Sequence, residues 1–441
     1  MSFVRRTGRV ATVGAAVGAM VLLAACGGGG NSGGNTTGGG QQQAGPNWNE
    51  KGPIQFVSGK DTSNAVPQII DKWNAQHPDQ KVTFIELSDS ADEQRNAMIQ
   101  NYQTKGADKT IYDMDVVWTA EFAANQYVVA LPDGKFDTSK MLKPAVDGAT
   151  YFNKLYAVPV TSDGGLLFYR KDWMDAAGIT SAPKTLDEVK TACKQMKEKV
   201  PEAKNADCYA GQFQKYEGLT VNVSEAINSA GGNIVKDGKV SVNSPEAQKG
   251  LQWIADGFKD GTIPQGAITW KEEESRQAFQ DGKLMFLRNW PYVYSKFSAA
   301  DGSSKVNGKF GVAALPGVGG PGVSSLGGHS YAVAQHAKNK GTALDFIAFA
   351  AAEEQQKQRT ITSSLAPTLE SLYSDQELVA KYPYLTPLKQ SIAGAQPRPK
   401  VVRYGDASKA IQDASYGVLQ GQKDAKSATA ELQTKLEGLV K

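Results

Sequence analysis

Apolar side chains recur in the first part of the globular chain with two different spacings, and this change predicts a strand, a helix and a second strand. Three of the four residues in 54–57 are apolar, and they predict a strand. Apolar residues at helical spacing follow in 66–73, and they alternate again in 82–87. Such a unit gives parallel strands joined by a right-handed crossover.

The polar loop after the first predicted strand lies at the carboxyl edge of the sheet, where ligands bind in open α/β folds. Asn64 ends this loop, and we include it among the candidate ligand contacts. The alternative is that Asn64 or Ser63 only caps the following helix.

Two further predicted strands end in polar clusters. The apolar residues within 112–117 mark a buried strand, and they place Asp115, Trp118 and Glu121 near its end. We therefore include these three residues among the candidate ligand contacts. Residues 154–160 predict another strand, which is followed by the polar segment 161–165.

A third run, residues 284–287, is also long enough for a buried strand. It is followed by Trp290 and Tyr292, and Pro291 between them suits the first turn of a helix. A flat indole just past a strand end can cover the apolar face of a sugar ring. The alternative is that Trp290 is a core residue.

The glycine pair 164–165 stands between two predicted strands with no helix inserted, which indicates a crossing between two lobes. Residues 326–331 indicate a second crossing. Thr185 and Glu188 form a capping box at the start of a helix, and Asp237-Gly238 is typical of a type I′ hairpin turn. The chain is therefore predicted to be a two-lobed α/β protein with a hinge.

The amino terminus carries an export signal. Three arginines precede an apolar stretch that ends in Leu-Ala-Ala-Cys at residues 23–26. This tetrapeptide resembles the lipobox of bacterial lipoproteins, which implies removal of residues 1–25 and acylation of Cys26. A transmembrane helix is the alternative, but the apolar stretch is too short for one. Residues 26–46, rich in glycine and free of charge, would form a flexible tether.

Charge and cysteine usage narrow the function classes. The formal net charge of +3 comes from the three signal arginines, so the remaining chain has 45 basic and 45 acidic residues. A neutral body is not built to bind nucleic acid. Cys193 and Cys208 are predicted to pair in an oxidising compartment, the alternative being two buried thiols. Too few further soft ligands are present for zinc, and we expect no metal and no cofactor.

Six segments together resemble the maltose/trehalose branch of the family 1 extracellular solute-binding proteins. They run in the family's order across nearly the whole chain, at residues 115–123, 163–172, 216–219, 286–292, 326–328 and 397–399. The resemblance implies a periplasmic-binding-protein-like fold of the class II type. We expect residues 53–162 with 331–372 in one lobe, and 163–330 with 373–441 in the other.

The resemblance also implies roles for individual residues. Asp115 and Asp163 would accept sugar hydroxyls, Trp290 and Tyr292 would stack on the sugar, Gly328 would offer a backbone contact, and Arg398 would donate hydrogen bonds. Asp115 and Asp163 can instead cap turns. Glu217, in the segment 216–219, joins the candidate ligand contacts. His329 and Thr161 depart from the family's usual aromatic residues and bear on which sugar binds.

The two resemblances together imply a lipid-anchored receptor on the outer face of the cell membrane. It would bind an α-glucosyl disaccharide such as trehalose or maltose and deliver it to the permease subunits of an ABC importer. We expect a monomer with no catalytic residue. The alternatives are an exported glycoside hydrolase, which also uses aromatics and two carboxylates, and the same receptor fold with a non-sugar ligand.

Overall fold

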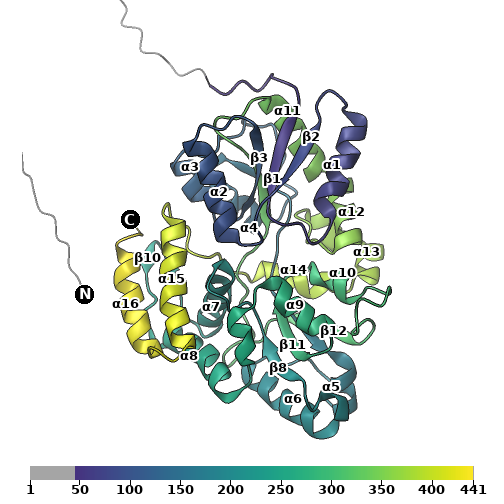
Figure 1. Cartoon of the computed structure of the whole chain (residues 1–441), viewed down its shortest axis with the longest axis vertical. Coiled ribbons are helices and arrows are strands. Elements are labelled where there is room, and N and C mark those ends of the chain that lie inside the picture. Colours follow the sequence, from purple (N-terminus) through teal and green to yellow (C-terminus); the bar gives the residue numbers. More distant parts are fainter. Residues whose placement is uncertain (1–44, 441) are drawn as a thin grey trace, which may run out of the picture. The chain divides into compact units, whose positions relative to one another are not determined.

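The computed structural model describes residues 45–440 and arranges them in two lobes, each built around its own sheet (Figure 1). The first lobe holds a five-stranded sheet in the order β2-β1-β3-β13-β6, and the second holds a four-stranded sheet in the order β12-β7-β11-β8. The predicted two-lobed α/β fold is confirmed. The strands are β1 Ile54–Ser58, β2 Val82–Glu86, β3 Lys109–Asp115, β6 Ala157–Pro159, β7 Leu166–Arg170, β8 Asp207–Ala210, β11 Leu284–Asn289, β12 Phe310–Ala314 and β13 His329–Val333.

Helices pack on both sheets. They are α1 Ala65–Gln76, α2 Ala91–Gln103, α3 Thr119–Ala124, α4 Lys143–Gly148, α5 Lys171–Ala177, α6 Leu186–Lys199, α7 Glu217–Ser229, α8 Pro245–Asp260, α9 Glu272–Gln280, α10 Val293–Phe297, α11 Lys340–Ala351, α12 Glu353–Ser363, α13 Gln376–Lys381, α14 Leu385–Ala393, α15 Tyr404–Leu419 and α16 Ala425–Glu437. None of the helices in the described part of the chain combines the length and apolarity that a membrane crossing requires.

The first three elements form the predicted strand–helix–strand unit. β1 pairs parallel with β2, and α1 between them buries Ile69, Ile70 and Trp73. β3 adds a second parallel partner on the other side of β1. The carboxyl ends of β1 and β3, at Ser58 and Asp115, therefore lie at the same edge of the sheet.

β13 makes this sheet mixed, because it pairs antiparallel with both β3 and β6. It is the strand that follows the second predicted crossing. In the register of β13 and β3, His329 lies opposite Asp115. A residue that begins one strand is thereby placed beside a residue that ends another.

β11 is an interior strand of the second sheet, and all six of its residues are buried. It pairs antiparallel with β7 and parallel with β8. The strand predicted at residues 284–287 is therefore confirmed, and it extends to Asn289. Trp290 follows directly after this strand, which is hydrogen-bonded to a neighbouring strand on each side.

The segments that cross between the lobes pair with one another. The backbone N–H of Asp163 donates to the carbonyl of Gly327 at 3.1 Å, and the N–H of Gly327 donates back at 2.9 Å. Gln396 joins them from a third segment, because its N–H donates to Ser324 at 2.8 Å and its carbonyl accepts from Leu326 at 2.9 Å. The crossings thus form a short ribbon rather than separate loops.

Helix α6 begins with the predicted capping box. The Thr185 hydroxyl accepts from the N–H of Glu188 at 3.1 Å, and the Glu188 carboxylate accepts from the N–H of Thr185 at 3.4 Å. Cys193 on this helix forms a disulfide with Cys208 on β8. The predicted disulfide therefore joins a helix of the second lobe to an edge strand of its sheet.

The predicted hairpin at Asp237-Gly238 is confirmed. β9 Val235–Lys236 and β10 Lys239–Val240 pair antiparallel across it, and both turn residues have positive φ, at 51° and 74°. A second hairpin, formed by β4 Thr150–Tyr151 and β5 Lys154–Leu155, was not predicted from the sequence. The single strand predicted over 154–160 is accordingly wrong, because β5 ends at Leu155 and β6 begins at Ala157.

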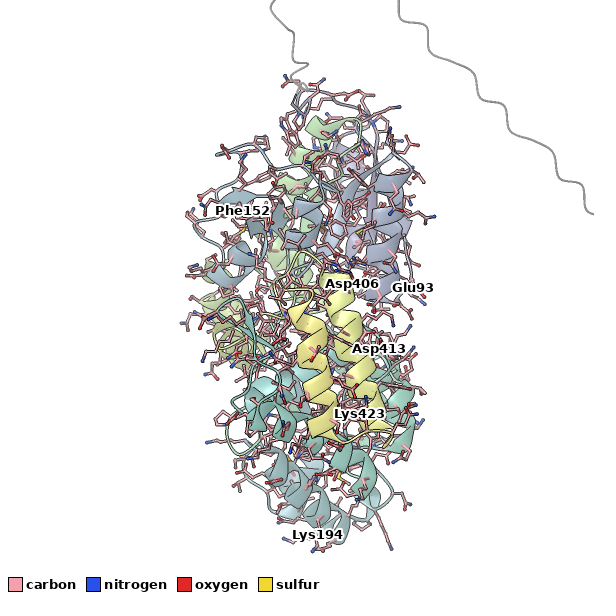
Figure 2. All side chains as sticks on the ribbon, turned by 90° about the vertical axis from the view of Figure 1, so that its left-hand side faces the viewer. Glu93, Phe152, Lys194, Asp406, Asp413 and Lys423 are labelled. Carbon is pink, nitrogen blue, oxygen red and sulfur yellow. A yellow bond between two sulfur atoms is a disulfide. The ribbon has the colours of Figure 1, made fainter. Side chains whose placement is uncertain are left out.

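Replacing Phe152-Asn153, the turn of this second hairpin, by Asn-Gly should stabilise the protein by about 1 kcal/mol. Both residues have positive φ, at 43° and 59°, and Phe152 is 82% exposed (Figure 2). An aromatic residue therefore occupies a strained position without being buried. Urea unfolding of the variant and of the parent measures the gain. As a control, Asp237→Asn exchanges two residues that both suit this turn and should change stability by only a few tenths of a kcal/mol.

Candidate functional site

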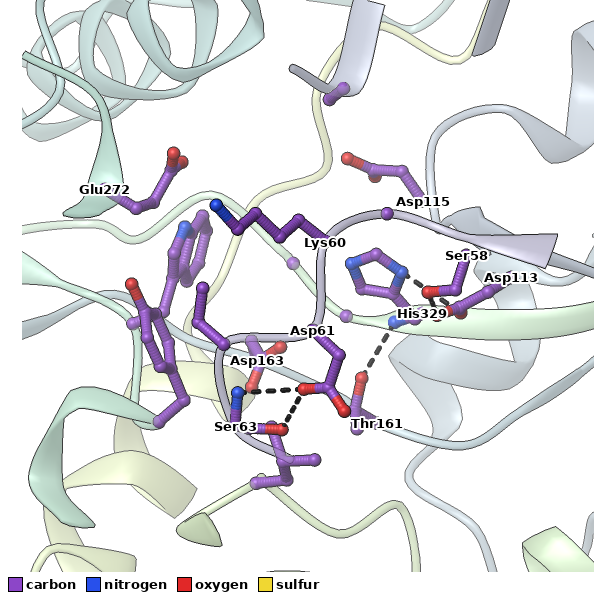
Figure 3. A pocket seen from close by; sticks show the side chains of 18 of the residues that line it. Ser58, Lys60, Asp61, Ser63, Asp113, Asp115, Thr161, Asp163, Glu272 and His329 are labelled. Carbon is purple, nitrogen blue, oxygen red and sulfur yellow. Dashed lines mark hydrogen bonds and ion pairs between the residues drawn. The ribbon is translucent and has the colours of Figure 1, made fainter. Parts of the chain in front are cut away.

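A cavity of about 300 Å³ lies between the two lobes and contains most of the predicted ligand contacts (Figure 3). Its walls come from the carboxyl ends of β1 and β3, from the crossing segments, and from the residues around α7, α9 and β11. The predicted residues that line it are Asp115, Asp163, Glu217, Trp290, Tyr292, Gly328 and Arg398.

Trp118, Glu121 and Asn64 do not line this cavity, which corrects their interpretation as ligand contacts. The chain turns into α3 directly after Trp118, and this turn directs both Trp118 and Glu121 inward. Trp118 is 1% exposed and stacks on Phe122. Glu121 is bound by the Arg95 guanidinium, with Arg95 Nε 2.6 Å from the carboxylate.

Asn64 begins α1 in the left-handed conformation, with φ at 60°, and its side chain makes no capping hydrogen bond. The cap comes from Asp61, whose carboxylate accepts from the N–H of Val66 at 2.7 Å. Ser63 contributes as well, because its hydroxyl oxygen accepts from the N–H of Ala65 at 3.2 Å. The Asn64 side chain therefore does not cap α1, and it does not line the cavity.

Trp290 lines the cavity and is half-buried, unlike the core residues around it. The Arg288 guanidinium covers its ring at 3.9 Å from the centroid. Its edge lies against the crossing ribbon, since a Cβ on Gly327 would come within 2.8 Å of Trp290 and 3.2 Å of Asp163 Cβ. The indole of Trp290 and the Cβ of Asp163 therefore both lie against Gly327.

Tyr292 also lines the cavity, and its hydroxyl donates to Glu273 at 2.6 Å. Gly328 lies on the ribbon with φ at 111°, and a Cβ there would come within 2.4 Å of the Thr161 carbonyl. Only glycine fits this position.

A buried ionic cluster joins the two lobes at the cavity. Arg398 Nη2 lies 2.7 Å from Asp115 at the end of β3, and Nη1 lies 2.5 Å from Glu217 at the start of α7. Glu217 also accepts from the Tyr404 and Ser408 hydroxyls. The side chains of Arg398 and Glu217 are at most 6% exposed, so the cluster is largely removed from water. Burial raises the pKa of Glu217 to about 7, against the opposing effect of Arg398.

His329 carries a second charge in the cavity wall. Its Nδ1 lies 3.1 Å from Asp113, which also accepts from the Ser58 hydroxyl at 2.6 Å (Figure 3). Burial lowers the pKa of His329, but Asp113, Asp115 and Asp163 outweigh it and raise the pKa to about 9. The imidazole is therefore protonated at neutral pH.

The Asp163 carboxylate interacts electrostatically with the His329 imidazolium. Burial raises its pKa to about 6, and His329 acts in the opposite direction. Within residues 45–440 no side chain donates a hydrogen bond to it. It is therefore free to accept hydrogen bonds from a ligand.

His329 and Thr161, the two departures from the family pattern, bind one another. The N–H of His329 donates to the Thr161 hydroxyl at 2.9 Å. The two residues therefore belong to the same part of the cavity wall, and a substitution of one would affect the other.

Replacing His329 by Gln should reduce stability in acid and change it little in alkali. Because folding raises the pKa of His329 from 6.5 to about 9, its contribution is fully present below pH 6.5 and is lost as the pH rises through about 9. The side chain is 41% exposed, so solvent screening limits the effect to about 1 kcal/mol.

Urea unfolding at pH 6 and at pH 9.5 tests this expectation. His336→Gln serves as the control, because His336 stacks on Tyr102 instead of pairing with a carboxylate. An equal loss for His329→Gln at both pH values would show that the imidazolium contributes nothing.

Sequence reasoning missed several charged residues of the cavity wall. Asp113 lies within an apolar strand, so its position in the cavity wall becomes evident only from its ion pair with His329. Lys271 and Glu272 lie at the start of α9, far from any predicted strand end. Lys60 and Asp61 belong to the polar loop after β1, in which only Asn64 was predicted to contact the ligand. Arg359 on α12 completes the set.

Residues 58–357 match the family of bacterial extracellular solute-binding proteins, and the chain belongs to this family. The family's proteins act outside the cytoplasm. A "Probable ABC transporter-binding protein" of Deinococcus radiodurans is 32% identical over 377 residues, which cover 83% of this chain and 87% of the relative.

Two further proteins have descriptions that include a sugar. The structure of "Maltose bound T. maritima MalE3" is 31% identical, with a TM-score of 0.83, and the match covers 88% of this chain and 99% of that one. The "Galactooligosaccharide-binding protein" of Bacillus subtilis is 26% identical over 299 residues, which cover 65% of this chain and 66% of the relative.

Proposed function

We propose that the chain is the sugar-binding component of an ABC importer, and that it holds an α-glucosyl disaccharide such as trehalose or maltose in the cavity between its lobes. It would deliver this sugar to the permease subunits. The observation that carries the proposal is the contact of Trp290 and Asp163 with the same glycine, Gly327. This arrangement presents an aromatic face beside a carboxylate that has no other partner in the described chain.

A pyranose ring has the matching chemistry, with an apolar face and a rim of hydroxyl groups. Trp290 and Tyr292 would take the face. Asp163 would accept from hydroxyl groups, and the cluster of Arg398, Asp115 and Glu217 would supply charge-assisted hydrogen bonds to the rim. Gly328 would let the ribbon backbone approach the ligand closely.

The relatives favour a sugar over other small molecules, because the T. maritima protein was solved with maltose and the B. subtilis protein is a galactooligosaccharide-binding protein. They also favour a receptor over a hydrolase, since the matched relatives are binding proteins. The polar cluster supports the same conclusion, because Asp115 and Glu217 are both paired with Arg398.

Calorimetric titration of residues 47–441 with trehalose, maltose, glucose and a galactooligosaccharide tests the proposal. The protein should first be unfolded and refolded to remove any sugar that remains bound from the cell. Tight binding of trehalose or maltose is the expected result. Binding of the galactooligosaccharide alone would move the ligand out of the α-glucosyl class, and steady glucose release from either disaccharide would contradict the receptor function.

We further propose that Cys26 is acylated and anchors the protein to the outer face of the cell membrane. Cys26 lies outside the described residues, so this proposal rests on the sequence around it. Replacing Cys26 by Ser should prevent incorporation of labelled palmitate and release the protein from the membrane fraction. Retention of the label in this variant would contradict the anchor.

A further inference from the structure

A second cavity, of about 500 Å³, lies next to the first and is bordered by both lobes. Residues of α2 and of the loop before α7 line it, together with the start of α15. Its wall is polar and charged, with Asp92, Glu93, Lys215 and Lys409 among the lining residues. The hydroxyl groups of a ligand could form hydrogen bonds with this wall. Tyr216 is the one aromatic residue that lines the second cavity among those that the structure describes.

Tyr216 and Lys271 line both cavities, and they form the wall between them. Tyr216 is fixed, because it is buried and its hydroxyl donates to Glu272 at 2.6 Å. Lys271 is held by Asp89, with Nζ 2.8 Å from the carboxylate. Asp89 follows β2 in the first lobe and Lys271 precedes α9 in the second, so this ion pair closes the wall across the gap between the lobes.

The ion pair is the part of the wall that can open. The Lys271 side chain is 19% exposed and the Asp89 side chain 47%, and a pair in contact with water contributes at most about 1 kcal/mol. A lysine stem also has many accessible rotamers. Sugar hydroxyls can replace both partners, because they donate to a carboxylate and accept from an ammonium group. In the structure the pair is formed, and its hydrogen bond lowers the pKa of Asp89.

We propose that Lys271, held by Asp89, determines the length of the saccharide that the protein accepts. The proposal rests on the proposed sugar-binding function. A disaccharide would fill the first cavity and end at the ion pair. A longer chain would have to displace Lys271 in order to extend into the second cavity, and its affinity would be lower by the free energy needed to break the pair.

The test compares the affinities of maltose and maltotetraose in the wild type and in Lys271→Ala, by calorimetric titration at low ionic strength. The quantity of interest is the ratio of the maltotetraose affinity to the maltose affinity. Removal of the lysine side chain should raise this ratio about fivefold, which corresponds to about 1 kcal/mol. The gain should come mainly from the longer saccharide.

Lys400→Ala is the matched control. Lys400 also reaches the first lobe, where its Nζ donates to the carbonyls of Asp147 and Thr150 at 2.9 Å, but it lines neither cavity. A change in lobe closure alone would alter both affinities by the same factor and leave the ratio unchanged. The ratio in Lys400→Ala should therefore equal that of the wild type.

Ionic strength provides a second measurement that needs no variant. Salt screens the exposed pair, so the ratio in the wild type should rise between 20 mM and 500 mM salt, whereas the ratio in Lys271→Ala should stay constant. Binding of both saccharides with the same ratio in wild type and Lys271→Ala would overturn the length inference alone. A wild type that binds neither saccharide would overturn the proposed function and this inference together.

Discussion

Replacing Arg398 by Met is expected to lower the free energy of unfolding by about 3–5 kcal/mol. Arg398 is 3% exposed, and its guanidinium neutralises Asp115 from one lobe and Glu217 from the other. Methionine fills much of the same space but leaves two carboxylates buried without a cation. Urea unfolding at pH 8 measures the loss.

Arg403→Met is the control for this prediction, because Arg403 pairs with Asp406 at the surface and both side chains are more than half exposed. It should cost at most about 1 kcal/mol. The pH dependence separates an ionic cause from a packing cause. Burial already raises the pKa of Glu217 to about 7, so in Arg398→Met the carboxylates can take up protons in acid, and the loss should be smaller at pH 5 than at pH 8. An equal loss at both pH values would contradict the ionic explanation.

Replacing Trp290 by Ala is expected to weaken binding of the preferred sugar by roughly 1.5–3 kcal/mol, the range for burying a large apolar side chain. The reason is that the indole lines the cavity and is backed by Arg288, so its removal takes away the surface on which the sugar would lie. Calorimetric titration of the variant measures the loss, and Trp290→Phe, which retains an aromatic ring, should recover part of it.

Trp253→Ala is the control, because it removes an indole from α8 in the same lobe without touching this cavity. Its affinity for the sugar should match that of the wild type. If Trp290→Ala bound the sugar as tightly as the parent, the indole would be a structural residue, and the cavity would have to be assigned a different ligand.

The sequence located β3 and β11, the two strands that lead to Asp115 and Trp290, because their apolar runs reflect burial. The run at 284–287 placed Trp290 at the cavity, and the run that ends near Asp115 placed that carboxylate there as well. The same reasoning failed for Trp118 and Glu121. Distance along the chain past a strand end does not reveal which way the chain turns, and here it enters α3 and directs both side chains inward.

Contacts between distant segments could not be predicted from local patterns. Asp113 was passed over because it stands in an apolar strand. Its role depends on the pairing of β13 with β3, which brings the His329 side chain from far along the sequence to within 3.1 Å of its carboxylate. Lys271 was missed for the same reason, since its partner Asp89 belongs to the other lobe. The hairpin at Phe152 was missed because its turn carries neither glycine nor another residue that favours positive φ at the first position.

The hydrogen-bonded ribbon of crossing segments has a mechanical consequence. Three independent linkers would let the lobes slide and twist relative to one another. Segments joined by the backbone bonds between Asp163 and Gly327, and between Gln396 and its neighbours, behave as one narrow sheet that bends easily across its plane but resists shear within it. We therefore expect the lobes to move relative to one another mainly by rotation about this ribbon. Each closure of the lobes would then return Asp89 to the same position opposite Lys271. The proposed selection of saccharide length would therefore be the same in every closed molecule, although the lysine side chain itself is flexible.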